Sequence, residues 1–374
     1  MFARIADFIR ETDKILLILC AFCSSYGCLA VFSATRPDNN FRAVLVQVLS
    51  TVAGIVAAAV ISTIDYEHFI KRWYVAAVLG VVPVILTFFI GIAPGETDDK
   101  AWLDLGFTTL QPSELMKICF MITFAAHISH VKKDINRPKV LLPVCLHGVF
   151  PTALIFFQGD YGTALVFAVM FVGMLWAAGV SWKYFTAAIT AAVIASPILY
   201  FFALNDDHRA RIKNMFDIDG DIRGIGYQQY RGRIALSNGG LFGQGLLRGE
   251  LTQTKDGIPE ARNDFIFVTI GEELGMLGCI VVVILLAAVC LRVLHIARIC
   301  RKDSGKFICA GFFSMLFAQI VINLGMCLSV LPVVGITLPF FSAGGTSLLC
   351  LFLGVGVVMS VYMHRNSRTI YLHD

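Results

Sequence analysis

Ten long apolar runs constrain the fold of this 374-residue chain more than any other feature. A bilayer core requires about 20 mostly apolar residues per helix. Only 15% of the residues are charged, whereas a soluble domain has about 25%. We therefore predict an all-α polytopic membrane protein with about ten transmembrane helices. The runs are 15–35, 43–63, 73–94, 113–130, 139–157, 162–179, 184–204, 274–296, 307–330 and 339–363.

Net charge and cysteine placement exclude two other classes of protein. The net charge of +4 comes from basic residues spread between the apolar runs, so no nucleic-acid partner is expected. The eleven cysteines lie mostly inside apolar runs and have no zinc-ligand spacing, which speaks against a disulfide framework or a structural metal site. No cleavable signal peptide is expected at the N-terminus.

The Lys and Arg residues of the short loops predict the orientation. Most of them lie on the side that carries both termini, and the short loops of the other side hold Arg36, Arg42 and Lys100. The positive-inside rule therefore predicts that both termini are cytoplasmic. We expect one membrane domain, 1–374, with these parts: a cytoplasmic N-terminus 1–14, seven spans within 15–204, a large extracytoplasmic loop 205–273, three spans within 274–363 and a cytoplasmic tail 364–374.

Unusual polar residues collect at the predicted outer ends of the spans. Because every group lies on the same side, we predict one site that opens outward, around ionisable residues that are costly inside a membrane. The candidate residues are Trp102, Gln111, Ser113, Glu114, Lys117, Asp160, Gln228, Arg231, Arg262, Asp264, Ser342, Gly344, Gly345, Thr346 and Ser347.

Some of these residues have a structural alternative. Glu114 and Lys117 are three apart on one helix face, so they form either part of a functional site or a structural ion pair. Asp160 can belong to the site, or it can simply cap the sixth span. The helix start at Gly344 and Gly345 can hold an anion, or its small residues can serve close helix packing.

The stretch ARNDFIFVTIGEELG, 261–275, contains the sharpest candidate, Asp264. The following run, 276–296, is long enough to span alone, so we expect a short interfacial or re-entrant helix before it. Gly271 and Gly275 fall on nearly the same face as Asp264 in helical register, where a neighbouring helix can approach closely. An aspartate at the edge of an apolar pocket suits a general base, and the alternative is an N-cap.

The same stretch ends on two adjacent glutamates, Glu272 and Glu273. We expect both at the outer mouth of the eighth span. There they would cap the span or balance nearby arginines.

Six motifs, in order along the chain, resemble those of the SEDS family (shape, elongation, division and sporulation), the RodA/FtsW-like peptidoglycan glycosyltransferases. The chain looks like a divergent member, because Ala101, Arg231, Arg262 and Asn263 depart from the common pattern. The motifs are WLDLG with LQPSELMK at 102–117, QGDYGTAL at 158–165, GYQ with NGGLFGQG at 226–245, NDFIFVTIGEELG at 263–275, NLGM at 323–326 and LPFFSAGGTSLL at 338–349.

The resemblance implies an enzyme that polymerises lipid II, an undecaprenyl-pyrophosphate-linked substrate, into glycan strands. Polymerisation would take place at the outer face of the bacterial cytoplasmic membrane, during wall synthesis for cell shape, division or sporulation. The implied protein partner is a class B penicillin-binding protein. The family's catalytic aspartate falls on Asp264, and its charged cavity residues fall on Glu114, Lys117 and Asp160.

Under this hypothesis Asp264 acts as general base on the acceptor hydroxyl, and the diphosphate of the donor leaves. Its negative charge would be stabilised by Arg231, Arg262 or Lys117, or by a divalent cation such as Mg²⁺ or Mn²⁺. The lipid tails would lie among membrane lipids in grooves between spans.

Two alternatives remain open from the sequence. The first is a flippase for lipid-linked oligosaccharides, which would require charged residues along a path through both faces. The second is a non-catalytic scaffold for a class B penicillin-binding protein.

Overall fold

A computed structural model describes residues 11–39, 41–93, 100–104, 106, 109–202, 206–216, 224 and 226–365. The predicted termini therefore lie partly outside the described residues, since 1–10 and 366–374 are not among them. The same holds for parts of the predicted outer loop, at 205, 217–223 and 225. The predicted division of the chain into segments of one domain stays a prediction.

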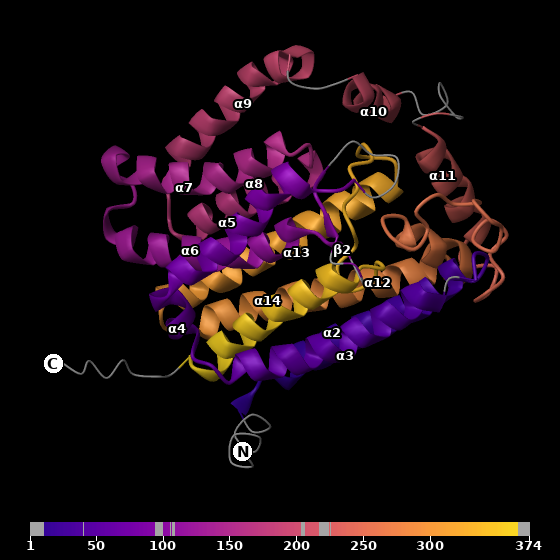
Figure 1. The fold of residues 1–374 in the computed structure, drawn as a ribbon, viewed down its shortest axis with the longest axis horizontal. Coiled ribbons are helices and arrows are strands. Elements are labelled where there is room, and N and C mark those ends of the chain that lie inside the picture. The colour runs from indigo at the N-terminus through magenta and orange to yellow at the C-terminus, as the bar shows by residue number, and fades with distance from the viewer. Residues whose placement is uncertain are drawn as a thin grey trace.

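Helices form nearly all of the regular structure (Figure 1). One short antiparallel pair, β1 (Leu103–Asp104) with β2 (Thr109–Leu110), precedes the fourth long helix. The helices are α2 (Lys14–Thr35), α3 (Phe41–Ser62), α4 (Tyr66–Lys71), α5 (Trp73–Ile90), α6 (Pro112–Val131), the 3₁₀ turn η1 (Lys132–Asp134), α7 (Pro138–Phe157), α8 (Tyr161–Ala177), α9 (Trp182–Phe202), α10 (Asp206–Phe216), α11 (Tyr227–Gly239), α12 (Ile266–Ile299), α13 (Asp303–Cys327) and α14 (Gly345–Met363).

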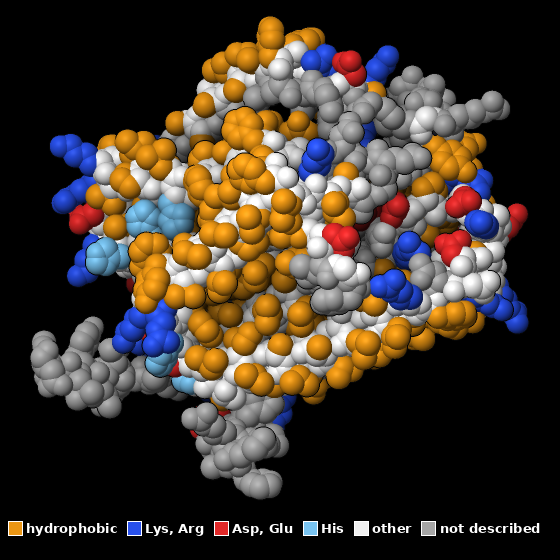
Figure 2. All heavy atoms as spheres, in the orientation of Figure 1, with side chains coloured by type: hydrophobic (Ala, Val, Ile, Leu, Met, Phe, Trp, Pro, Cys, Tyr) orange, Lys and Arg blue, Asp and Glu red, His pale blue; other side chains and the backbone are white. Residues whose placement is uncertain are grey.

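Every predicted apolar run corresponds to a helix. Among the described residues nine helices are long and apolar enough to cross a membrane, and α8, at 17 residues, is the shorter tenth. Hydrophobic side chains cover the middle of the molecule, while most visible charged side chains lie toward its left and right ends (Figure 2). The protein is therefore an all-α, multi-pass membrane protein, as predicted.

The predicted start of the tenth span is wrong. The apolar run begins at 339, but α14 begins at Gly345. Between them the chain forms a turn in which Phe340 has a positive φ of 68°. The hydroxyl of Ser342 accepts a hydrogen bond from the Leu338 N–H at 2.8 Å, so this turn satisfies its own backbone without a helix.

The helices that bury most of their length are α6, α13 and α14. Helix α3 packs closely along α14, because a Cβ at Gly356 would lie only 2.9 Å from the Cα of Ala58. By contrast, α9 stands at the edge of the bundle, and none of its described side chains is buried (Figure 1).

The bundle has two ends that differ in character. We call one the terminal end, where α2 begins and α14 ends, and the other the loop end, which carries the long 240–265 loop. At the terminal end the Asp13 carboxylate caps α2 through the Leu16 N–H at 2.9 Å and pairs with Arg292 of α12 at 2.8 Å. Lys132 and Asp303 form a second ion pair there, at 2.8 Å.

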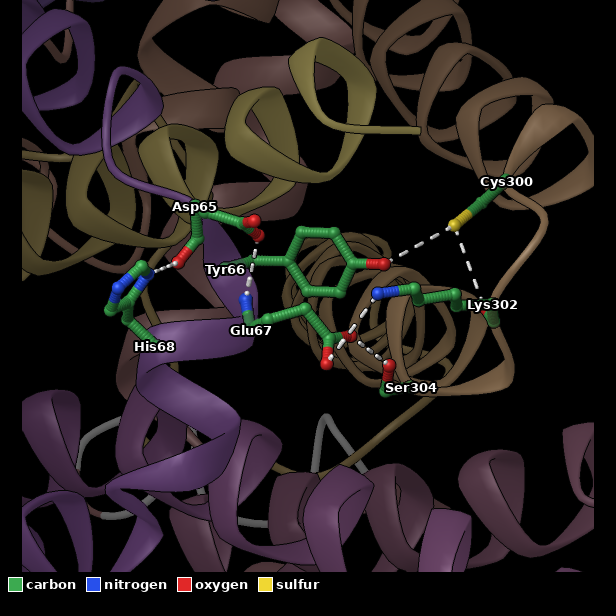
Figure 3. A network of polar contacts seen from close by, with 7 residues as sticks. All are labelled: Asp65, Tyr66, Glu67, His68, Cys300, Lys302 and Ser304. Carbon is green, nitrogen blue, oxygen red and sulfur yellow. Dashed lines mark hydrogen bonds and ion pairs between the residues drawn. The ribbon is translucent and has the colours of Figure 1, made fainter. Parts of the chain in front are cut away.

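A polar network closes the terminal end between α4 and the turn that joins α12 to α13 (Figure 3). The buried Tyr66 hydroxyl lies 4.0 Å from the Cys300 sulfur, and the Ser304 hydroxyl donates to the Glu67 carboxylate at 2.8 Å. Lys302 approaches the same carboxylate at 3.8 Å. These contacts tie α4, which lies between α3 and α5, to the junction of α12 and α13.

Helix α12 consists of two helices that meet at Gly275, where φ is 67° and ψ is −167°. This backbone conformation is open essentially to glycine alone. The break leaves backbone groups without helical partners, and the loop at 240–245 supplies partners. The Met276 N–H donates to the Gly240 carbonyl at 2.9 Å, and the Glu272 backbone carbonyl accepts from the Gln244 N–H at 3.0 Å. The predicted short helix before the span is thus confirmed as 266–274.

Helix α11 approaches the short helix at its glycines. A Cβ at Gly239 would lie 1.9 Å from the Gly271 carbonyl oxygen, and a Cβ at Gly271 would meet Leu236 of α11 at 2.3 Å. The predicted close approach of a neighbouring helix at Gly271 is confirmed.

Glu272 and Glu273 are buried, and the role predicted for them is wrong. Glu272 accepts hydrogen bonds from the N–H groups of Leu251 and Thr252, at 2.8 and 2.7 Å, and from the Thr252 hydroxyl. Glu273 accepts from Ser33 of α2 at 2.6 Å and from Gln253 at 3.0 Å. Backbone N–H, hydroxyl and side-chain amide donors bind these carboxylates, and these bonds fasten the loop to the bundle.

Replacement of Gly275 by alanine should lower the free energy of unfolding by about 3 kcal/mol or more. The new Cβ would lie 2.3 Å from the Gly243 nitrogen in a backbone region that alanine rarely adopts. Gly179→Ala is the matched control, since Gly179 also has a positive φ, 83°, but open space around it. There we expect about 1–2 kcal/mol. Thermal unfolding in detergent measures both, and equal losses would contradict the steric role of the break.

Glu272→Gln should lower the unfolding free energy by about 2–4 kcal/mol, because it weakens two charge-assisted bonds to buried backbone N–H groups. The control is Glu250→Gln, which changes an exposed carboxylate on the same loop. Thermal unfolding of the two variants should separate them clearly, and similar midpoints would show that Glu272 does not hold the loop.

Candidate functional site

Asp264 lies directly before the short helix of α12, at the loop end. Its backbone carbonyl accepts a hydrogen bond from Asn323 of α13 at 2.8 Å and from the Cys327 thiol at 3.5 Å. Its carboxylate faces the 331–344 loop, where a Cβ at Gly335 would lie 3.7 Å from Oδ2. The backbone is therefore fixed, while the carboxylate takes no part in these bonds.

The surroundings of Asp264 favour its protonated form. Burial is the largest cause of a rise in the pKa of this carboxyl, the negative charges of Glu260 and Asp160 add to the rise, and Arg211 of α10 opposes it. Together they bring the pKa to about 7. A carboxyl that titrates near neutral pH is suited to general acid–base chemistry.

The predicted capping role of Asp160 is confirmed, and its carboxylate also contacts Gln111. Its Oδ1 accepts from the Thr163 N–H at 2.8 Å, which caps α8, and its Oδ2 accepts from Gln111 at 3.0 Å. Burial raises the pKa of Asp160, and its bonds from Thr163 and the charge of Lys117 oppose that rise. One aspartate thus caps a helix and joins the polar group near Asp264.

Glu114 and Lys117 form a buried ion pair at 2.7 Å, with Lys117 only 1% exposed. Buried pairs are expensive to desolvate, so their presence near other ionisable groups indicates more than stabilisation. Glu114 also lines a cavity with Ser342, Ser347 and Gln319. The Oε1 atom of Gln319 is buried there without a hydrogen-bond partner among the described residues, and so is the Ser113 hydroxyl beside Glu114.

The segment before α14 is bonded to the segment before Asp264. The Ser342 hydroxyl donates to the Asn263 carbonyl at 2.7 Å, and the Ala343 N–H donates to the Arg262 carbonyl at 2.8 Å. Thr346 reaches the Thr109 carbonyl at 3.4 Å, next to the start of α6. These bonds gather three distant parts of the sequence around one site.

The glycines at the start of α14 serve close packing. A Cβ at Gly345 would lie 2.5 Å from Val46 of α3, and the Gly344 N–H already donates to Gln47 at 3.3 Å. This arrangement favours the packing alternative over the anion-holding one.

Other predicted residues lie farther out in the loop region. Trp102 pairs through its backbone with Ile92, and Gln228 is half-buried on α11. The Arg231 side chain donates to the Gly257 carbonyl at 2.7 Å, and Arg262 lines a second, outer pocket. The structure thus groups the predicted residues Gln111, Ser113, Glu114, Lys117, Asp160, Asp264, Ser342 and Ser347 more closely than Trp102, Gln228 and Arg231. Arg262 is bonded to this group through its carbonyl and also lines the outer pocket.

Four residues of the site were missed by the sequence-based prediction. Arg211 was one of many basic residues in a polar loop, with nothing in its spacing to single it out. Gln319, Asn323 and Gln47 could have been found from the sequence, because each is a polar residue inside a predicted apolar span.

No group of three His, Cys, Asp or Glu residues that could hold a metal ion occurs in the described part of the chain. The carboxylates near Asp264 therefore do not make a complete protein site for a divalent cation. We assign no step to a metal.

Comparison with known proteins gives full-length matches. The chain is 33% identical over 362 residues to the peptidoglycan glycosyltransferase MrdB of Escherichia coli K12, which covers 96% of this chain and 95% of MrdB. It is 30% identical to the probable peptidoglycan glycosyltransferase FtsW of Geobacter metallireducens, over 94% and 95% of the two chains. It is 29% identical to the stage V sporulation protein E of Bacillus subtilis, over 95% and 96%.

Two solved structures share the fold at lower sequence identity. One, described as "Structural coordination of polymerization and crosslinking by a peptidoglycan synthase complex", matches with a TM-score of 0.81 at 24% identity, over 96% of this chain and 99% of that one. The Thermus thermophilus rod shape determining protein RodA matches with a TM-score of 0.70 at 23% identity, over 96% and 98%. A family model for cell cycle proteins (FtsW, RodA, SpoVE) matches residues 13–367. The chain belongs to this FtsW/RodA/SpoVE family, the SEDS family predicted from its motifs.

Proposed function

We propose that the protein is a peptidoglycan glycosyltransferase that polymerises lipid II into glycan strands for wall synthesis. The observation that carries this proposal is the Asp264 carboxyl, whose pKa lies near 7 beside a buried polar group at the loop end. Full-length relatives that bear the name peptidoglycan glycosyltransferase support it.

The proposal includes an orientation in the bacterial cytoplasmic membrane. The loop end, with Asp264, faces outward, and both termini are cytoplasmic. The bias of Lys and Arg toward the short loops of the terminal side supports this orientation.

In the proposed reaction the deprotonated Asp264 accepts the proton of the acceptor sugar hydroxyl. The hydroxyl oxygen forms a bond with the anomeric carbon of the donor, and the bond from that carbon to the diphosphate oxygen breaks. The diphosphate leaves with the electron pair and needs cationic stabilisation. The candidates for this stabilisation are Arg231, Arg262, Lys117 and also Arg211, whose charge acts on Asp264.

Lys117, Arg231 and Arg211 already have partners. The Lys117 ammonium is paired with Glu114, the Arg231 Nε donates to the Gly257 carbonyl, and Nη1 of Arg211 donates to the Val333 carbonyl at 3.1 Å. A divalent cation, Mg²⁺ or Mn²⁺, would have to take part of its oxygen ligands from the diphosphate itself.

We also propose a class B penicillin-binding protein as partner, within a shell of membrane lipids. The related structure of a peptidoglycan synthase complex, in which polymerisation and crosslinking are coordinated, supports this. The flippase and scaffold alternatives become outcomes of the first test below.

Asp264→Asn should reduce lipid II polymerisation by at least about 100-fold. Folding should survive, because the hydrogen bonds from Asn323 and Cys327 reach the Asp264 carbonyl and not its carboxylate. The measurement is glycan formation by purified protein with its partner, together with thermal unfolding. Asp134→Asn, at the terminal end, is the control.

Full polymerisation by Asp264→Asn would overturn the assignment of the base. If the wild-type protein makes no glycan but moves lipid II between leaflets of a vesicle, the flippase is correct. If it does neither yet activates the partner, the scaffold is correct.

The pH profile gives a second test. Because the base must be deprotonated, kcat/KM should rise with pH and reach half of its plateau near pH 7. Glu260→Gln removes a negative charge that raises the pKa of Asp264, so the rising limb should move to lower pH. A limb that stays in place or moves to higher pH would contradict this electrostatic coupling.

A further inference from the structure

A second, outer pocket lies at the loop end, apart from the cavity beside Glu114. Its volume of about 330 Å³ is in the range of small-molecule sites. In Figure 2 acidic and basic side chains gather at this right-hand end, beyond the apolar middle of the molecule. The lining residues that carry polar side chains, apart from the threonines, are Asp38, Tyr227, Asp256, Glu260 and Arg262.

The wall of the outer pocket is held in place by buried groups. Glu272 accepts a hydrogen bond from the Thr252 N–H, and Glu273 accepts one from the Gln253 side chain, so both glutamates fix the position of the loop. From the side, Arg231 donates to the Gly257 carbonyl at 2.7 Å and lies over the Tyr227 ring at 5.9 Å. Supports of this kind keep a binding surface in one shape before its ligand arrives.

Two residues of the wall have unusual backbone conformations. Asp256 has a φ of 56° and Glu260 a φ of 51°, a region that is uncommon for residues other than glycine. Strain of this kind persists where the surrounding structure imposes it, and it concentrates at ligand sites. Here it occurs twice in the lining of one pocket.

The charges of the lining select the type of ligand. It contains three carboxylates and one guanidinium, so a diphosphate would be repelled. The carboxylates of Asp38 and Asp256 have no hydrogen bond or ion pair with any described residue, and both are exposed. Carboxylates accept hydrogen bonds from hydroxyl and amide donors, and the Tyr227 ring adds a flat apolar surface. An uncharged, hydroxyl-rich saccharide fits this combination.

The outer pocket is connected to Asp264 through one turn of the chain. The Glu260 carbonyl accepts hydrogen bonds from the N–H groups of Asn263 and Phe265, at 3.0 and 3.2 Å, so one turn carries both Glu260 and Asp264. Arg262 belongs to the same turn and lines the pocket. Residues that line the pocket are therefore only a few positions from Asp264 in the chain. A saccharide held there would lie near the sugar that reacts at Asp264.

We propose that the outer pocket binds sugar units of the glycan strand, beyond the sugar that reacts at Asp264. This inference rests on the proposed function and adds a strand subsite to it. The subsite retains the strand between successive additions, so it sets the length of the product.

The test compares the double variant Asp38→Asn/Asp256→Asn with the wild type and with Glu250→Gln. Glu250 is an exposed carboxylate on the same loop that does not line the pocket. All three proteins should unfold at the same temperature, because none of the changed carboxylates bonds to a described residue. Binding is measured with chitotetraose, an uncharged oligomer of an N-acetylated amino sugar, and strand length with labelled lipid II and the partner present.

We expect the double variant to bind chitotetraose about tenfold or more weakly, as the loss of hydrogen bonds to charged groups implies. It should also release several-fold shorter strands, whereas Glu250→Gln should match the wild type in both measurements. Unchanged binding and unchanged strand length in the double variant would overturn the subsite.

The two arms separate this inference from the proposed function. If the wild type does not polymerise lipid II, the proposed function fails, and chitotetraose binding alone then decides whether the pocket holds a saccharide. If the wild type polymerises lipid II but binds no chitotetraose and the double variant makes strands of normal length, only the subsite fails.

Discussion

The structure depends on the need to satisfy every backbone N–H and C=O group where the chain is not helical within or beside a membrane. Fully buried side-chain amides meet this need at the loop end. Asn323 donates to the carbonyls of Asp264 and Ile336, and Gln229 donates to those of Met326 and Leu331. Gln47 bonds to the segment before α14 in the same way. These bonds allow irregular backbone to lie between spans and to carry the site.

The break in α12 follows from the same requirement. Gly275 ends one helix and begins another, and the loop at 240–245 bonds to the backbone groups released by the break. The break separates the short helix from the span, and Asp264 lies at the loop end, before that short helix. Glu272 then faces the loop and becomes its anchor. A single glycine conformation thus decides the positions of a candidate base and of a structural carboxylate.

Burial and like charges act in the same direction on the aspartates of the site and favour their protonated forms. Burial raises the pKa of Asp264 and of Asp160, and negative neighbours raise each further. Stability alone would favour fewer carboxylates here, since buried charges are expensive. Their convergence from the starts of three distant helices is therefore an argument for function, and the strained turns of the outer pocket extend that argument to the neighbouring loop.

The sequence by itself determined the membrane class, the positions of the spans and the identity of the acidic candidates, because hydrophobic length and rare intramembrane charges are local signals. It also predicted the short helix before 276–296, since the run after it could span alone. Only the tertiary structure decided what each polar side chain binds. Glu272 accepts hydrogen bonds from backbone N–H groups about twenty residues away, and the charge of Arg211 acts on Asp264 although the two residues lie far apart in the sequence. Such pairings depend on how irregular segments fold back over the bundle, and no periodicity in the sequence records that path.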